Sequence, residues 1–211
     1  MLPKAEKNRD RRCIALALTH AKTHRFTVAE FERLHQMDVF GKDARVELIE
    51  GEVVEMPPMN TPHGNGVMHS NQVLGALFGD THWVRVQSPL NLSSWSQPEP
   101  DLALVPRGYD QSSHPTSADL IVEVSDTSLY DRDEKASLYA MAGIPELWIV
   151  NVLDRCLEVL RNPERNLRKA FGFHYATWTT HNGEDRVAPL LGSDRAVLVA
   201  DLLGPVLPTA P

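Results

Sequence analysis

The stretch ADLIVEVSDTSLYDRDEKASLY, residues 118–139, decides the fold of this chain. It opens with a short apolar run at 120–124 that is rich in β-branched residues and bounded by polar ones. Such a run predicts a central strand that is covered on both faces. Glu123 interrupts the run, and burying a carboxylate is unfavourable unless a partner compensates for its charge. We therefore expect Glu123 to have such a partner.

Two further charged residues lie within reach of Glu123 in this scheme. A second short strand is expected at 99–105, with Asp101 near its start, and a helix is expected at 128–142, with Lys135 on it. If the two strands are neighbours in one sheet, the two acids face each other and the lysine lies above them. This constellation predicts a metal site.

The chemistry that such a site permits is phosphoryl transfer to water. A hard cation such as Mg²⁺ takes oxygen ligands and keeps several waters, and it polarises a phosphoryl oxygen and lowers the pKa of a bound water. Lys135 could orient that water or stabilise the charge that builds up on the phosphate. Ser125 has no histidine near it in sequence, and the chain contains neither GxSxG nor a Gly-rich phosphate loop.

The spacing alone leaves a second interpretation open. Asp101 could be a turn residue and Glu123 could pair with an arginine or with Lys135, without any metal, because structural ion pairs produce similar constellations. Glu47, in an expected hairpin at 46–56, could face either solvent or the site. His63 is expected just before a helix that ends near Gly79, where it would cap the helix or donate a hydrogen bond.

Composition restricts the class of protein. The chain has 211 residues and a net charge of −7, which disfavours a protein that coats nucleic acid by bulk electrostatics. No apolar run approaches membrane-spanning length. Cys13 and Cys156 form no CxxC pattern, which favours a reducing compartment and a cytoplasmic location. The basic and apolar segment at the start lacks the features of a secretory signal.

The expected organisation is one α/β (α+β) domain at 25–200, with an N-terminal extension at 1–24 and a C-terminal tail at 201–211. Thr27 and Glu30 have the spacing of a capping box at a helix start, and Glu50-Gly51 is expected to be a hairpin turn. The remaining strands are expected at 83–92, 146–152, 156–160, 171–179 and 196–199.

Several separated motifs follow one another in an order that resembles a known family. They are Glu99-Pro100-Asp101, Asp119 to Ser125, Asp131 to Tyr139 and Ala142 to Val150, preceded by Phe26 to Leu34, Glu47 to Glu52 and His63-Gly64. Together they closely resemble the Uma-type restriction endonuclease family of the PD-(D/E)XK nuclease superfamily. The resemblance covers roughly residues 25–160. It implies a restriction-endonuclease-like fold, with a mixed central β-sheet flanked by helices.

The resemblance also implies roles for individual residues. It gives the metal-ligand role to Asp101 and Glu123. The superfamily's lysine normally follows the glutamate by two positions, where this chain has Ser125, and the family's lysine on the following helix corresponds to Lys135. Glu47 matches an upstream acidic residue that would complete the catalytic set. Weaker matches make His63 and Ser125 candidates for substrate binding.

The expected function is that of a Mg²⁺-dependent endonuclease, with Mn²⁺ as a substitute, that hydrolyses DNA phosphodiester bonds without a covalent intermediate. Cutting both strands of a duplex needs two sites, which suggests a homodimer. Tyr139 and Trp148 are either dimer contacts or core residues. Arg161, Arg165 and the basic residues at 168–169 either touch phosphates or form a solvated loop.

Two other functions compete with the endonuclease. One is a catalytically inactive nuclease-like module that binds DNA or regulates a partner, which the acidic charge and the serine at position 125 favour. The other is an ion-paired structural protein without nucleic-acid contact. Metal binding would separate the endonuclease and the inactive module from the structural protein. DNA cleavage would separate the endonuclease from the inactive module.

Overall fold

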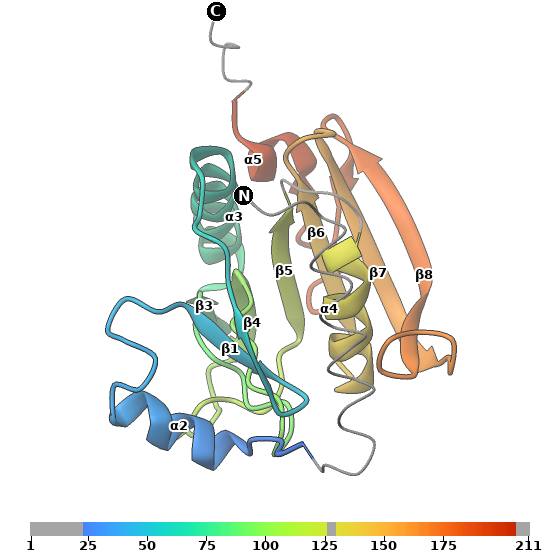
Figure 1. Cartoon of the computed structure of the whole chain (residues 1–211). Helices are drawn as coiled ribbons and strands as arrows, with labels where there is room; N and C mark the ends of the chain where they lie inside the picture. The colour runs from blue at the N-terminus through green and yellow to red at the C-terminus, as the bar shows by residue number, and fades with distance from the viewer. Residues whose placement is uncertain (1–22, 126–129, 206–211) are drawn as a thin grey trace, which may run out of the picture.

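A mixed six-stranded sheet forms the centre of the computed structural model, which describes residues 23–125 and 130–205 (Figure 1). Its strands lie side by side in chain order from β3 to β8. They are β3 His82–Val86, β4 Leu102–Pro106, β5 Leu120–Ser125, β6 Glu146–Asn151, β7 Cys156–Arg165 and β8 Phe173–Asn182. Only β5 and β6 run parallel among these neighbours. The expected mixed central sheet is confirmed.

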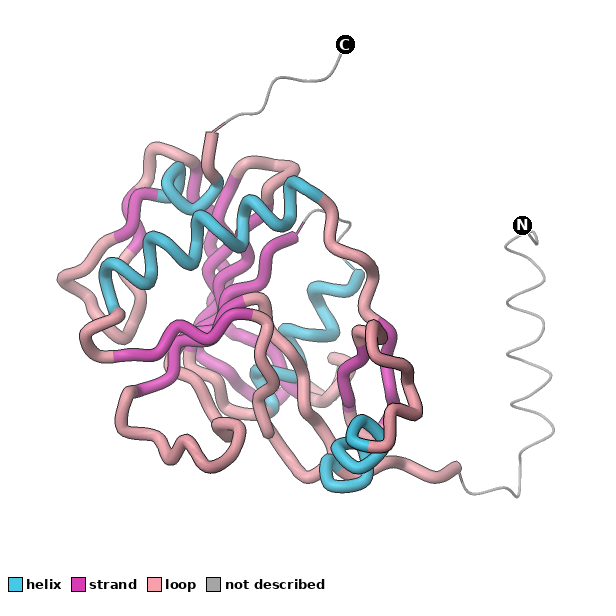
Figure 2. The backbone as a smooth tube through the Cα atoms, turned by 90° about the vertical axis from the view of Figure 1, so that its left-hand side faces the viewer, coloured by secondary structure: helices cyan, strands magenta, loops and turns pink. Residues whose placement is uncertain are grey.

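Helices cover both faces of this sheet (Figures 1 and 2). α3, Thr61–Phe78, and α5, Val199–Leu203, pack on one face, and α4, Tyr130–Met141, packs on the other. Alternation along β5 sends Val122 and Val124 towards α3 and Ile121 towards α4. Glu123 shares the face of Ile121. The sheet therefore aims this acid at α4.

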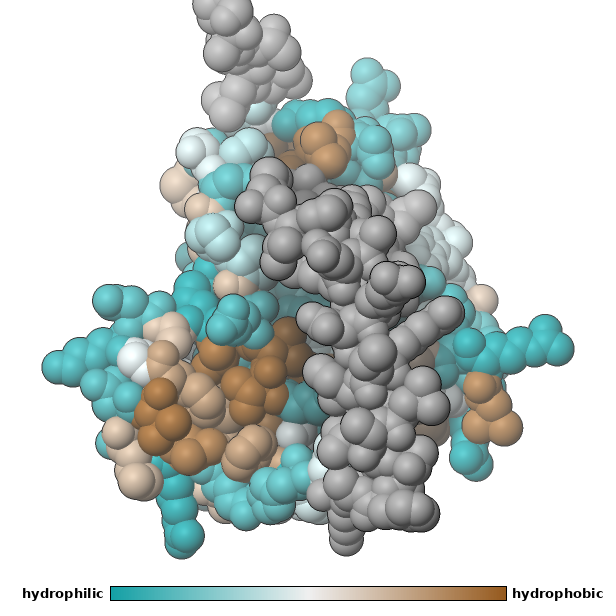
Figure 3. Space-filling view, in the orientation of Figure 1, coloured by the Kyte–Doolittle hydropathy of each residue, from teal (hydrophilic) through white to brown (hydrophobic). Residues whose placement is uncertain are grey.

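A smaller unit lies beside the sheet and contributes Glu47 to the candidate site. It consists of α2, Val28–Gln36, and a hairpin of β1, Val46–Ile49, and β2, Glu52–Glu55. The hairpin turn has positive φ at both Glu50 and Gly51, which matches the expected turn and a type I′ geometry. Apolar side chains are exposed on the face that carries this unit (Figure 3). A two-stranded sheet of β9, Arg186–Val187, and β10, Val197–Leu198, lies near the end of the chain.

Several expected boundaries differ from the structure for local reasons. β3 ends at Val86 rather than at residue 92, because Gln87 turns the chain with φ 43°. β4 begins at Leu102, so Asp101 lies just before the strand. α3 begins at Thr61 with an Asn60 cap, which places His63 in its first turn instead of before it.

The C-terminal boundary of the domain and the expected dimer contacts also differ from the expectation. α5 runs past residue 200 and buries Leu202 and Leu203, so the packed chain continues into the stretch that was expected to be a tail. Tyr139 and Trp148 are fully buried, so the dimer-contact interpretation of both is wrong. Residues 1–22, with Cys13, and the expected helix start at 128–129 lie outside the described residues. No helix in the described part has the length and apolar character needed to cross a membrane.

Candidate active site

β4 and β5 bring Asp101 and Glu123 together. The two strands pair antiparallel up to Leu102 and Val122, and the two acids are the next residues on each strand. The Asp101 N–H donates to Glu123 Oε2 at 3.4 Å, and the Val124 N–H donates to Asp101 Oδ2 at 2.9 Å. Each acid is thus held partly by the backbone of the other's strand.

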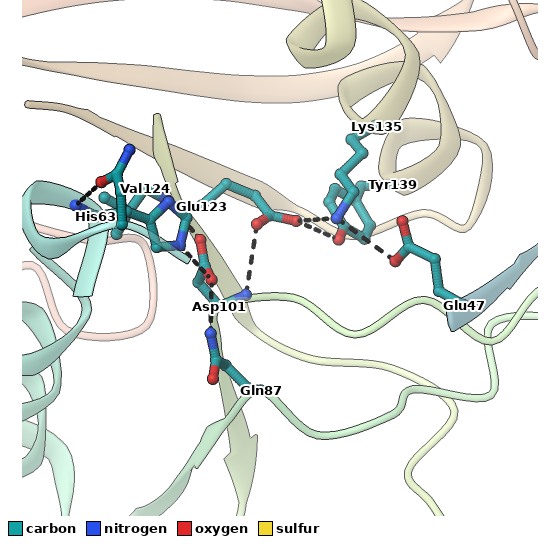
Figure 4. Close-up of polar contacts among 9 residues, drawn as sticks. Glu47, His63, Gln87, Asp101, Glu123, Val124, Lys135 and Tyr139 are labelled. Atoms are coloured by element: carbon teal, nitrogen blue, oxygen red, sulfur yellow. Dashed lines mark hydrogen bonds and ion pairs between the residues drawn. The ribbon is translucent and has the colours of Figure 1, made fainter. Parts of the chain in front are cut away.

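α4 supplies two side chains to Glu123 (Figure 4). Lys135 and Tyr139 are four residues apart and therefore share one face of the helix. Lys135 Nζ lies 3.4 Å from Glu123 Oε1, and the Tyr139 hydroxyl donates to the same oxygen at 2.6 Å. One carboxylate oxygen of Glu123 is therefore engaged by a cation and a phenol at once.

Glu47 reaches the same lysine from the hairpin. Its Oε2 lies 3.5 Å from Lys135 Nζ and accepts the Glu99 N–H at 3.2 Å. Glu47 is only 4% exposed. Of the two orientations left open for it, the structure has the one that faces the site.

The residues around Asp101 come from α3 and from the end of β3. His63 Nε2 lies 3.0 Å from Asp101 Oδ1, and the Gln87 side-chain amide donates to this oxygen at 3.4 Å (Figure 4). Gly66, one turn after His63, lets α3 approach β5 closely, because a Cβ at this position would lie 2.7 Å from Val124 Cγ1. His63 thus lies beside the site, and the close packing of α3 on β5 brings it within hydrogen-bond distance of Asp101.

The acids, the lysine and the histidine of the site line one pocket of about 390 Å³. All six candidates from the sequence border it, and Ser125, on β5 beside Asn151 of β6, is among them. The pocket-lining candidates are Glu47, His63, Asp101, Glu123, Ser125 and Lys135. The structure therefore brings these six candidate site residues together in one pocket.

The pKa values of Glu123 and Asp101 are shifted in opposite directions. Burial raises the pKa of Glu123 to about 7, and the charges of Asp101 and Glu47 add to the effect against the opposing pull of Lys135 and Tyr139. Burial also acts to raise the pKa of Asp101, but the hydrogen bond and charge of His63 outweigh it and bring this pKa below the usual value. At neutral pH the two carboxyl groups thus differ in protonation.

Lys135 stays charged in this environment. Burial alone would lower its pKa, but Glu123, Glu47 and Asp101 together raise the pKa of Lys135 well above its usual value. A lysine that keeps its proton cannot take one from water. Its chemistry is therefore that of a fixed cation that stabilises negative charge.

The donor set suits a hard divalent cation. Among the residues the structure describes, no three His, Cys, Asp or Glu side chains converge as a ready-made metal cluster. Mg²⁺ does not need one, because it is commonly held by one or two carboxylates and keeps several waters. Asp101 and Glu123 could supply these carboxylates, and a cation would offset both the burial and the neighbouring acidic charges that raise the pKa of Glu123.

Two contributors to the site were missed by sequence reasoning. Tyr139 was expected to be a dimer contact or a core residue, although its position four residues after Lys135 indicated that the two side chains share one helix face. Gln87 had no such signal, because its contact depends on the positive φ that ends β3.

The mixed sheet flanked by helices is the architecture of restriction-endonuclease-like proteins. The family model of Uma2, described as "Putative restriction endonuclease", matches residues 28–189, and the chain belongs to this family. This membership supports a nuclease function.

One solved structure with the same fold is that of "a putative nuclease belonging to DUF820" from Anabaena variabilis. It is 14% identical, with a TM-score of 0.64, and the match covers 84% of this chain and 97% of that one. At this identity the likeness concerns the fold alone. No curated protein matches the chain in sequence.

Proposed function

We propose that the protein is a metal-dependent endonuclease that hydrolyses DNA phosphodiester bonds. The observation that carries the proposal is the convergence of Asp101, Glu123 and Lys135 in one pocket, with the two acids on adjacent strands. In this proposal Asp101 and Glu123 hold Mg²⁺, and Mn²⁺ can replace it. A bound cation of this kind would polarise a phosphoryl oxygen and lower the pKa of a water.

The protein's own residues act on the substrate's charge and position. Lys135, which remains protonated, faces the phosphate and stabilises the negative charge of the in-line displacement. Glu47 assists by holding Lys135 from the hairpin side at 3.5 Å. His63 and Ser125 border the pocket and are proposed to contact the substrate. No covalent intermediate is needed.

A catalytically inactive DNA-binding or regulatory module is the second candidate. The serine at position 125, where the superfamily's lysine would stand, favours it. Against it stands the retention of three acids around one lysine, since buried charges are unfavourable to keep without a use. Cleavage separates the two candidates.

Two features of the biological setting belong to the proposal. A homodimer would provide the two sites that cutting both strands of a duplex requires. A cytoplasmic location agrees with two cysteines that form no CxxC pattern.

The test is hydrolysis of circular single-stranded DNA and of supercoiled plasmid, each with Mg²⁺ or Mn²⁺. We expect metal-dependent cleavage of at least one substrate by the wild-type protein and its loss in Asp101→Asn and Glu123→Gln. Glu52→Gln, a change at an exposed hairpin residue, is the control and should cleave normally. Absence of cleavage by folded protein would favour the inactive module, and cleavage that survives both site variants would show that the site is elsewhere.

A further inference from the structure

The pocket has two walls that come from different parts of the chain. The hairpin and the loop after it form an apolar wall, whose members are Val54, Met56, Pro57, Pro58 and Met59. Val54 and Met59 are 40% and 41% exposed. α4 and β6 form the opposite wall, which carries Lys135. Partly exposed apolar side chains next to acidic ones offer a ligand both an apolar and a charged contact surface.

The two walls meet at the base of the pocket. Lys135 Nζ, from α4, lies within 3.5 Å of Glu47 Oε2, from the hairpin, and within 3.4 Å of Glu123 Oε1 (Figure 4). Asp101 is only 7% exposed. A phosphate must therefore enter the pocket between hairpin and helix to reach the acids. One strand of nucleic acid can follow this route, whereas a strand that is still paired brings its complement against the walls.

The charge of the lining also disfavours a duplex. Acidic side chains outnumber basic ones in the pocket lining. The lining contains one arginine and one lysine, Arg45 and Lys135. Its acids are Glu47, Glu55, Glu99, Asp101, Glu123 and Glu134. A duplex carries one negative charge per roughly 1.7 Å of axis, twice the density of one strand, and its binding relies on many Lys and Arg contacts to phosphates. An acidic lining therefore repels a duplex more strongly than a single strand.

We propose that the pocket takes one unpaired nucleotide, so that the substrate is single-stranded DNA rather than intact duplex. The base lies against the apolar wall at Val54 and Met59, and its phosphate points to Asp101 and Glu123. A pocket of about 390 Å³ falls in the range of sites that enclose one small molecule. Unpaired bases expose faces that can pack against apolar side chains and remove apolar area from water, whereas the faces of paired bases are already covered in the duplex. This inference rests on the proposed nuclease function, and a single-strand substrate would not require the dimer.

The test measures binding separately from cleavage. Fluorescence anisotropy compares a labelled single-stranded oligonucleotide with a hairpin duplex of the same length, in Ca²⁺ and in Mg²⁺. We expect at least tenfold tighter binding of the single strand. Met59→Ala should weaken single-strand binding by roughly fivefold, because it removes apolar contact area between the side chain and the base. Met68→Ala, at a 55% exposed methionine of α3 outside the pocket lining, is the matched control and should bind normally.

Equal or tighter binding of the duplex, no binding of either DNA, or equal effects of the two methionine variants would overturn the inference. Selective single-strand binding that depends on Met59 would support it even if no cleavage occurred, and in that case only the proposed hydrolysis would fail. Rates on the two DNA forms give a second measure, because the same preference should reappear in kcat/KM.

Discussion

The hydroxyl of Tyr139 should set the pH range in which the site works. It donates to Glu123 Oε1 at 2.6 Å from a fully buried position. Tyr139→Phe removes this donor and leaves the ring, so the packing of α4 on the sheet should change little. Because the hydrogen bond favours the ionised form of Glu123, its loss should raise the pKa of this carboxyl.

The size of the change follows from the strength of the bond. A hydrogen bond to a charged group contributes about 1.5–3 kcal/mol, and one pKa unit corresponds to about 1.36 kcal/mol. The pKa of Glu123, about 7 in the wild type, should therefore rise to between roughly 8 and 9 in the variant. At pH 7 the ionised fraction would fall from about one half to roughly one tenth or less.

The assay is the pH dependence of kcat/KM for metal-dependent DNA hydrolysis, which reports pKa values of the free enzyme. The acid limb of the profile should move to higher pH by about one to two units in Tyr139→Phe, and the two rates should converge at alkaline pH. Tyr175→Phe is the control, since its buried hydroxyl donates to the Ile144 carbonyl. An unmoved acid limb in Tyr139→Phe, or the same movement in both variants, would refute the reasoning.

Three further predictions concern metal affinity and stability. Because Glu123 must lose its proton to bind a cation and has a pKa of about 7, Mg²⁺ affinity should fall about tenfold per pH unit below pH 7 and level off above it, as titration calorimetry can show. Glu146 is fully buried and accepts bonds from an arginine, a tryptophan and a backbone N–H. Glu146→Gln should lower the free energy of unfolding in urea by about 3 kcal/mol, whereas the exposed control Glu164→Gln should change it by less than about 0.5 kcal/mol. In α3, Gly66→Ala would press a Cβ against β5 and should destabilise by about 1–3 kcal/mol, while Gly75→Ala, with open space around it, should stabilise by about 1 kcal/mol. Similar effects of the two glycine changes would contradict the close approach of α3 to the sheet.

The parts of the fold that could be predicted are those with a local signal. The apolar run of β5, interrupted only by Glu123, predicted a strand buried on both faces, and Thr27 with Glu30 predicted a capping box, which the structure contains. The start of α3 had a signal that was not used, since an asparagine cap with a proline in the first helical turn, here Asn60 and Pro62, is typical of a helix start. The end of β3 had none, because the positive φ of Gln87 depends on its surroundings.

The candidate site likewise has contacts that the sequence predicts and contacts that it does not. The alternation along β5 and the helical position of Lys135 make the meeting of Glu123 and Lys135 predictable once β5 and α4 are packed together. The orientation of Glu47 was not predictable, because its hairpin packs beside the sheet rather than within it, through a bridge between Leu48 and Gln97. Contacts that depend on how two separate units meet leave no trace in local sequence periodicity.

The central claim is that Asp101 and Glu123 form a divalent-cation site. Electron paramagnetic resonance titration of Mn²⁺ at pH 8 tests it directly, with the wild-type protein and the double variant Asp101→Asn/Glu123→Gln. We expect one Mn²⁺ to bind per wild-type chain and excess Mg²⁺ to displace it. We expect the folded double variant to bind no Mn²⁺. Equal Mn²⁺ binding by both proteins, or none by either, would contradict it.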